Sequence, residues 1–510
     1  MSGYSRGSVV KRNILANFAG SGWTALMSLV FVPLYIHFMG IEAYGLVGVY
    51  VTLLVLVTLL DMGLSSTLNR ELARLSVQEN AGRETRDLLR TLEVVFWPLA
   101  VLIATALFLL APFIASHWLQ SSSLLPATTQ QAIVLMGAAI ALQVPFGFYS
   151  GGLLGLQRQT LLNGILIVMA TVRHGGAVLV LWLVSPTITA FFSWQLVGAA
   201  LQTAVLAVLL WRSLPAADAR ARFRMHAIRR VWRFAAGVSG ITVLAVILTQ
   251  LDKILLSRLL TLEMFGYYTL AGVVAMSLYR LASPVFLALY PRFSELVVHG
   301  DQLELRQLYH RSCQLLSVLI LPVALMIAFF SGEILLLWTR DETTVQHTAL
   351  VLSLLVVGTA LNGLMQLPYA LQLAHGWTRL ALYSNVVAVA VLVPMIFFAT
   401  SHYGAVGAAS VWVLLNSGYL LISLQVMHTR LLPGEKWRWY FEDVGLPLLA
   451  ALAVVALGRW LLPTPIGMVA LFLWLAGVSI AALAASALAA PKIRQWALQG
   501  FARLRVSYVT

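Results

Sequence analysis

The chain has 510 residues, of which 60% are hydrophobic and only 10% are charged. This composition is too apolar for a soluble domain and is typical of a protein that crosses a bilayer many times. A formal net charge of +14 would suggest nucleic-acid binding in a soluble protein. The composition excludes that class, so the distribution of the charges is more informative than their sum.

Apolar windows of about 20 residues, the length that crosses a hydrocarbon core of roughly 30 Å, predict about fourteen transmembrane helices. The predicted fold class is an all-α polytopic membrane protein. In chain order, the windows cover 14–38, 45–67, 92–115, 130–154, 161–184, 189–211, 235–260, 266–290, 313–335, 347–373, 380–400, 405–428, 444–463 and 466–490.

The basic residues indicate how these helices are oriented. If the helices alternate from a cytoplasmic N-terminus, about 27 of the 33 Lys and Arg residues fall on the cytoplasmic side and about three on the opposite face. This asymmetry predicts a multi-pass protein with both termini in the cytoplasm. The basic cytoplasmic loops also predict contact with anionic lipid head groups.

The chain contains an internal repeat. Residues 41–45 (IEAYG) recur as 262–266 (LEMFG), and residues 143–145 (QVP) recur as 366–368 (QLP), at offsets of 221 and 223. Each predicted half holds an even number of helices, so the halves enter the membrane in the same orientation and a pseudo-two-fold axis runs along the membrane normal. We predict two six-helix bundles and a terminal helix pair. The predicted segments are bundle 1–211, basic cytoplasmic linker 212–234, bundle 235–428, helix pair 429–490 and amphipathic cytoplasmic tail 491–510.

Three cations lie alone inside apolar windows, namely Arg173, Lys253 and Arg280. A charge at membrane depth is costly, so such a residue usually faces a protein-lined cavity that holds a counter-ion. Arg offers paired donors to a phosphate, and Lys offers a mobile point charge. The functional hypothesis is a cationic cavity that binds a phosphate-bearing substrate, and the alternative is pairing with acids inside the protein.

Asp61 and Asp252 are the clear carboxylates at membrane depth, and they are candidates for ion pairing or for coupling to a proton gradient. Adjacent helical positions point about 100° apart, so Asp252 and Lys253 do not face one point squarely. Pairing of Asp252 with Arg280 on the next predicted helix is an alternative. For His37 and His174, which are further candidate proton carriers, a packing role is favoured.

Several classes of protein are not supported by the sequence. The loops leave no room for a soluble catalytic domain, and the GxxxxGK[ST], HExxH and GxSxG motifs are missing from the sequence. The single cysteine, Cys313, allows neither an intramolecular disulfide nor a thiol cluster. We therefore expect no enzyme activity, no metal site, no cofactor and no nucleic-acid partner.

Two stretches resemble a known family. The first runs from Asn13 to Arg74 and the second from Gln250 to Tyr268. They are similar to the oligosaccharide (O-antigen, Wzx-type) flippases, a polysaccharide transporter family of the multidrug/oligosaccharidyl-lipid/polysaccharide (MOP) superfamily, and the outline of the resemblance covers the whole length. The matching residues are Asn17, Pro33-Leu34-Tyr35, Met39-Gly40, Glu42-Ala43-Tyr44-Gly45, Asp61-Met62-Gly63-Leu64, Arg70-Glu71, Gln250-Leu251-Asp252-Lys253 and Phe265-Gly266-Tyr267-Tyr268.

The resemblance implies a V-shaped pair of bundles that alternates access across the inner membrane. It implies that the substrate is an undecaprenyl-diphosphate-linked oligosaccharide, moved from the cytoplasmic to the periplasmic leaflet for O-antigen, lipopolysaccharide or exopolysaccharide biosynthesis. Polysaccharide polymerase and export proteins are the expected partners. A cation-coupled multidrug exporter and a peptidoglycan-precursor flippase of the same superfamily are the alternatives. A drug exporter is disfavoured, because cationic drugs call for an acidic cavity and the intramembrane cations here outnumber the acids.

Overall fold

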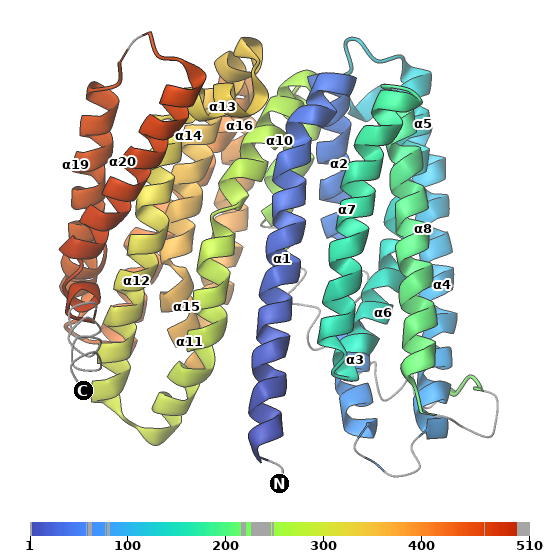
Figure 1. Ribbon diagram of the computed structural model, residues 1–510, viewed down its shortest axis with the longest axis horizontal. Coiled ribbons are helices and arrows are strands. Elements are labelled where there is room, and N and C mark those ends of the chain that lie inside the picture. Colours follow the sequence, from blue (N-terminus) through green and yellow to red (C-terminus); the bar gives the residue numbers. More distant parts are fainter. Residues whose placement is uncertain are drawn as a thin grey trace. The chain divides into compact units, whose positions relative to one another are not determined.

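The computed structural model describes residues 3–496 except 58, 60–63, 77, 79–81, 216–220, 226–245, 247–248 and 464, and it describes only the backbone of 3–18. In this part of the chain the regular structure is helical, and one isolated bridge joins Gln120 to Thr261. The chain forms two compact units, Met1–Gly266 and Tyr267–Thr510. Figure 1 shows their helices in sequence colours, from blue through green to red.

The first unit is built from long helices and several shorter ones. A further helical stretch covers 249–259, and α10 begins in this unit and continues into the second. The bounds are α1 (Gly3–Met39), α2 (Ile41–Val57), α3 (Leu64–Leu75), α4 (Gly82–Phe113), η2 (Ile114–Trp118), α5 (Pro126–Ala141), α6 (Gln143–Gly155), α7 (Gln159–Leu183), α8 (Ile188–Ser213) and α10 (Leu262–Met276).

The second unit continues the series and ends with two antiparallel helices. Within this unit, the α11–α12 and α19–α20 connections lie at opposite ends (Figure 1). The bounds are α11 (Tyr279–His299), α12 (Gln302–Phe329), α13 (Ser331–Thr339), α14 (Glu342–Leu364), α15 (Gln366–Ala374), α16 (Arg379–Gly418), η3 (Tyr419–Ser423), α17 (Leu424–Leu431), α18 (Lys436–Arg438), η4 (Trp439–Gly445), α19 (Leu446–Trp460) and α20 (Met468–Ala489).

The Gln-x-Pro repeat of the sequence marks a repeated break in a helix. Leu142 separates α5 from α6, and Met365 separates α14 from α15. Pro145 and Pro368 follow these breaks by three residues. Because proline has no N–H to donate, the carbonyl at the end of the preceding helix loses its helical partner and the helix is interrupted. The repeat therefore has the same local consequence in both halves.

The packing of the helices is also repeated. In the first unit α3 packs on α6, while α5 packs on α4 and α8; in the second unit α11 packs on α15, while α14 packs on α12 and α16. The helices that end before the Gln-x-Pro motifs, α5 and α14, thus pack on corresponding helices of their own units. The terminal helices α19 and α20 follow the second of these bundles.

The described part of the chain has eleven helical stretches long and apolar enough to span a membrane. Arg379–Leu431 covers two predicted helices, because Gly404 has a φ of +57° and turns the chain inside α16. The predicted helix at 45–67 falls largely on the shorter apolar α2, and the one at 235–260 lies mostly outside the described residues. The all-α, multi-pass class is confirmed, and the count of fourteen stays a prediction.

The two copies of the first repeated motif, residues 41–45 and 262–266, contact each other within the first unit. A Cβ on Gly45 would lie 2.2 Å from the carbonyl oxygen of Leu262, and a Cβ on Gly266 would lie 2.4 Å from the carbonyl oxygen of Ile41. Gly45 and Gly266 occupy the same position of the repeat, as do Ile41 and Leu262. The starts of α2 and α10 therefore make a reciprocal backbone contact that only glycine permits.

We expect Gly45→Ala and Gly266→Ala each to lower the free energy of unfolding by about 1–3 kcal/mol, because an added methyl group overpacks the contact. Gly272→Ala, in the same α10 helix with nothing within 4 Å of the new Cβ, should raise it by up to about 1 kcal/mol through helix propensity. Apparent melting temperatures in detergent measure the difference. Equal melting temperatures for the three variants would rule out the reciprocal contact.

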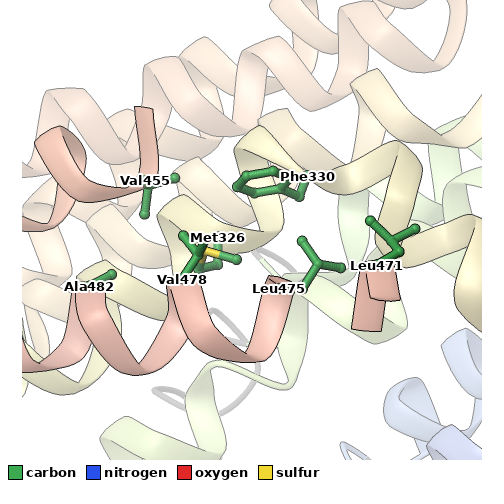
Figure 2. Close-up of a cluster of buried hydrophobic side chains, with 7 residues drawn as sticks. All are labelled: Met326, Phe330, Val455, Leu471, Leu475, Val478 and Ala482. Atoms are coloured by element: carbon green, nitrogen blue, oxygen red, sulfur yellow. The ribbon is translucent and has the colours of Figure 1, made fainter. Parts of the chain in front are cut away.

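The terminal helix pair is fixed to α12 by a buried apolar cluster. Met326 lies near the end of α12, and the fully buried Phe330 comes directly after the last residue of this helix. Figure 2 shows the cluster in close-up. Its members are Met326, Phe330, Val455, Leu471, Leu475, Val478 and Ala482.

Candidate functional site

Arg173 lies in the middle of α7, and its guanidinium group binds side chains of α8 and α2. Nε and Nη2 donate to Oε1 of Gln195 at 3.0 and 2.7 Å, and Nη1 donates to Oε1 of Gln202 at 3.5 Å. Nη2 also donates to the hydroxyl of Tyr50 at 3.3 Å. All three partner side chains are buried. The guanidinium group is therefore held in one orientation by three residues.

Among the described residues, the side-chain partners of Arg173 are uncharged. Two amide oxygens and a phenol supply dipoles that solvate the guanidinium group, but they do not neutralise its charge. A half-buried cation solvated in this way is a site where an anion is favourable, because the positive charge is already desolvated and oriented. Arg173 is therefore the candidate anion-binding residue of this site.

Two glycines make room for this arrangement. A Cβ on Gly198 would lie 2.8 Å from Cγ of Arg173, and a Cβ on Gly176 would lie 2.2 Å from the ring of Trp194. The Trp194 indole donates from Nε1 to the carbonyl oxygen of Arg173 at 3.1 Å. The close approach of α7 and α8 therefore fixes both the backbone and the side chain of Arg173.

His174, the next residue on α7, belongs to a packed aromatic layer. Its Nδ1 lies 2.9 Å from the hydroxyl of Tyr35, and its ring stacks on Phe31 with 6.0 Å between centroids. These contacts fit the packing role favoured from the sequence. His37, by contrast, is exposed.

Lys253 and Asp252 contact each other. Nζ of Lys253 lies 3.7 Å from Oδ1 of Asp252 and donates to the carbonyl oxygen of Thr249 at 3.0 Å. From the sequence we expected Asp252 and Lys253 not to face one point squarely. They nevertheless make contact, because the four-carbon side chain of Lys253 reaches around the helix. The charge of Lys253 is therefore partly balanced within its own helix, unlike that of Arg173.

Arg280 lies in the second unit, in the first turn of α11, and its side chain is exposed. The neighbouring Tyr279 starts a chain of polar contacts: its hydroxyl donates to Oδ1 of Asn362 at 2.8 Å, and Nδ2 of Asn362 donates to Oδ1 of Asn416 at 2.7 Å. Asn416 is fully buried. The start of α11 is thus anchored to α14 and α16 by the amide side chains of Asn362 and Asn416.

The structure places the predicted site residues in separate environments. Arg173 has its own set of neutral partners, Lys253 and Asp252 are brought together, and Arg280 lies in the second unit. Asp61 lies outside the described residues.

Two partners of Arg173 were not predicted from the sequence. Neither Tyr50 nor Gln202 was singled out in the sequence. A signal for Gln202 was present, because Gln195 and Gln202 are seven residues apart, which places them on one face of a helix two turns apart. No local signal pointed to Tyr50, which lies 123 residues before Arg173.

Comparison with solved structures defines the class of fold. The lipid II flippase MurJ in an inward closed conformation matches with a TM-score of 0.70 at 13% identity, over 92% of this chain and 97% of its own. An inward-facing multidrug resistance MATE family transporter of the MOP superfamily matches with a TM-score of 0.64 at 13% identity, over 80% of this chain and 94% of its own. The chain therefore has the same helical fold as these two proteins.

Sequence comparison defines the family. The profile of the family described as "Polysaccharide biosynthesis protein" matches residues 10–297, more than half of the chain, and the chain belongs to that family. A "Putative O-antigen transporter" of Shigella flexneri is 20% identical over 433 residues, which cover 83% of this chain and 98% of that protein. These matches confirm the resemblance seen in the two sequence stretches.

Proposed function

We propose that the protein is a flippase that moves an undecaprenyl-diphosphate-linked oligosaccharide from the cytoplasmic to the periplasmic leaflet of the inner membrane by alternating access. The family match supports a role in polysaccharide biosynthesis, and the O-antigen transporter of Shigella flexneri supports a lipid-linked glycan as the cargo. The transporter fold supports translocation rather than catalysis.

The observation that carries this proposal is the hydrogen bonding of Arg173. A lipid-linked diphosphate must cross the apolar bilayer with its negative charge, and a cation at membrane depth lowers the energy of that charge. Arg173 is already oriented by Gln195, Gln202 and Tyr50. Its charge is then available for a phosphate oxygen, with little reorganisation on binding.

The other predicted residues have supporting roles in this proposal. Lys253 and Arg280 would add positive charge along the substrate path. Asp252 would partly neutralise the charge of Lys253. Asp252 is then a structural ion-pair partner, and Asp61 is the candidate for coupling to a proton gradient. We also propose that the two six-helix bundles, 1–211 and 235–428, alternate access, with both termini and the 212–234 linker in the cytoplasm.

Complementation tests the proposed function in cells. In a strain whose own exporter of a defined undecaprenyl-diphosphate-linked glycan has been deleted, we expect this protein to restore the surface polysaccharide. Surface glycan and accumulated lipid-linked intermediate are measured together, because a flippase must raise the first and lower the second. Restoration of neither, with the protein present in the membrane, would contradict the proposal for that glycan class.

Two parallel strains separate the alternatives. A strain depleted of its peptidoglycan-precursor flippase grows only if the protein carries that precursor, and a drug-hypersensitive strain gains resistance only if the protein exports cationic drugs. We expect neither rescue, because the desolvated charge of Arg173 favours an anion and repels a cationic drug. Drug resistance without glycan export would make the protein a multidrug exporter.

A further inference from the structure

A histidine at the start of α12 is buried between two carboxylates. Nδ1 of His310 lies 2.5 Å from Oδ2 of Asp443 in η4, and Nε2 of His310 lies 3.1 Å from Oε2 of Glu435. The side chains of His310 and Asp443 are 1% and 0% exposed, and that of Glu435 is 17% exposed. Water therefore cannot replace either of these contacts freely.

Two hydrogen bonds at His310 need one proton more than a neutral ring and two ionised carboxylates carry. A neutral imidazole carries one N–H, so it can donate to only one of two carboxylates, and the other carboxylate would face a nitrogen lone pair. Both contacts are hydrogen bonds only if the ring carries two protons or one carboxyl group is protonated. Asp443 already accepts at Oδ1 from Nε2 of Gln314 at 3.0 Å. The arrangement of His310, Asp443 and Glu435 thus requires a bound proton.

The buried His428 nearby differs from His310 in its hydrogen-bond partners. Its Nδ1 lies 3.1 Å from the carbonyl oxygen of Leu424, and its Nε2 lies 3.3 Å from the hydroxyl of Tyr309. A carbonyl accepts and a hydroxyl can donate, so a neutral ring satisfies both contacts. His310 and His428 are equally buried, but only His310 has partners that need a second ring proton.

Several charged and titratable side chains surround His310. Arg306 forms an ion pair with Glu435, and Arg438 forms ion pairs with Glu435 and Glu442. The other titratable groups packed around the site are Tyr309 and Cys313 of α12, His428 of α17, and Lys436 and Tyr440.

The site fastens the end of the chain to α12. Asp443 lies at the start of the terminal helix pair, and Gln314 accepts at Oε1 from the backbone N–H of Lys492 at 2.8 Å. His310 and Gln314 therefore hold both the beginning of the helix pair and the segment that follows it. These two residues stand one helical turn apart on α12.

The first unit uses the equivalent positions in the same way. Asp87 and Thr91 of α4 precede His310 and Gln314 by 223 residues, which is the offset of the Gln-x-Pro repeat. Asp87 accepts from the backbone N–H of Arg222 at 2.7 Å and from Nε of Arg224 at 3.0 Å, and Thr91 accepts from the N–H of Arg224 at 2.9 Å. Each bundle thus binds the segment that follows it, but the first does so without a histidine.

We propose that His310, Asp443 and Glu435 form a proton-binding site that holds the terminal helix pair and its following segment on α12. The proton belongs to the docked state, so docking is favoured at low pH and weakens as the pH rises and the proton is lost. The equivalent contact of the first unit is formed by an Asp–Arg pair that needs no such proton, so the pH dependence is confined to the second unit.

Cys313 provides the measurement. It is the single cysteine of the chain, it is 3% exposed, and it lies one turn after His310 on α12. We would measure its rate of alkylation by N-ethylmaleimide in the full-length protein between pH 6 and pH 9. Dividing each rate by that of the same protein unfolded in SDS at the same pH removes the ionisation of the thiol itself. The ratio then reports the opening of the site.

We expect this ratio to rise at least about tenfold from pH 6 to pH 9 in the unmodified protein, since loss of one proton changes the opening equilibrium by up to tenfold per pH unit. The Glu435→Gln variant should stay protected at both pH values. Its amide can donate to the lone pair of a neutral His310, so the site closes without the extra proton. This variant keeps the test valid if His310→Gln fails to fold.

Three further results bear on the proposal. The His310→Gln variant should be open at pH 6 and change less than about twofold by pH 9. Asp87→Asn, the matched change at the equivalent position, should keep the pH dependence of the unmodified protein. A ratio in the unmodified protein that is the same at pH 6 and pH 9, or a Glu435→Gln variant with unmodified pH dependence, would overturn the proposal.

Discussion

Replacing Arg173 with Gln is expected to reduce glycan export by roughly 30- to 100-fold, while the amount of protein in the membrane changes less than about twofold. Loss of a charge-assisted contact to a phosphate removes about 2.0–2.7 kcal/mol of binding. Arg173→Lys should lose about tenfold, because the charge remains and the paired donors do not. Export is measured in the complemented strain as surface glycan per unit of membrane protein.

Arg292→Gln provides the matched control for this prediction. Arg292 also lies on a long helix, α11, but it forms ion pairs with Glu295 and Glu304, so it has no uncompensated charge to offer an anion. We expect its export to stay within about twofold of the unmodified protein. If Arg173→Gln and Arg292→Gln export equally well, Arg173 does not bind the diphosphate.

Phe330→Ala is expected to produce the largest loss of stability, about 3–5 kcal/mol, because it empties the centre of the cluster between α12 and the terminal helices. Phe330 is fully buried there (Figure 2) and the guanidinium carbon of Arg459 lies 5.5 Å from the centroid of its ring. The loss should appear as a lower melting temperature in detergent. It should also expose Cys313 of α12 to alkylation at pH 6, because the terminal pair loses its apolar contact with Phe330.

The neighbouring Phe329 provides the control. Its side chain is 40% exposed, whereas that of Phe330 is 0% exposed. Phe329→Ala removes the same atoms from the same point in the chain, and we expect a change below about 1 kcal/mol. Equal melting temperatures for the two variants would show that the cluster does not hold the terminal pair.

The sequence predicted those features whose cause is local. Apolar length predicted the spanning helices, and the Gln-x-Pro repeat predicted corresponding positions in the two halves, because a missing N–H acts within one helical turn. Arg173 was found because a charge in an apolar window is conspicuous. The alternating-access bundles and the cytoplasmic termini rest on the same local signals and stay predictions.

Features made by packing between distant segments were not predicted. His310 and Asp443 are 133 residues apart, and neither stands out in its own window. Their contact exists because η4 packs on α12, which hydropathy alone does not indicate. The contact between Lys253 and Asp252 is local and was still not predicted. The prediction considered the directions in which the two side chains leave the helix, but not the length of the lysine side chain.

Transport in proteoliposomes tests the central claim most directly. Purified protein is reconstituted with an undecaprenyl-diphosphate oligosaccharide that carries a fluorescent label on the sugar, and a membrane-impermeant quencher reports the label in the outer leaflet. We predict that the protein exposes the inner-leaflet pool to the quencher, and that Arg173→Gln does so roughly 30- to 100-fold more slowly. Movement no faster than in protein-free vesicles, with the protein correctly inserted and a proton gradient imposed, would contradict the assignment as a flippase of lipid-linked glycans.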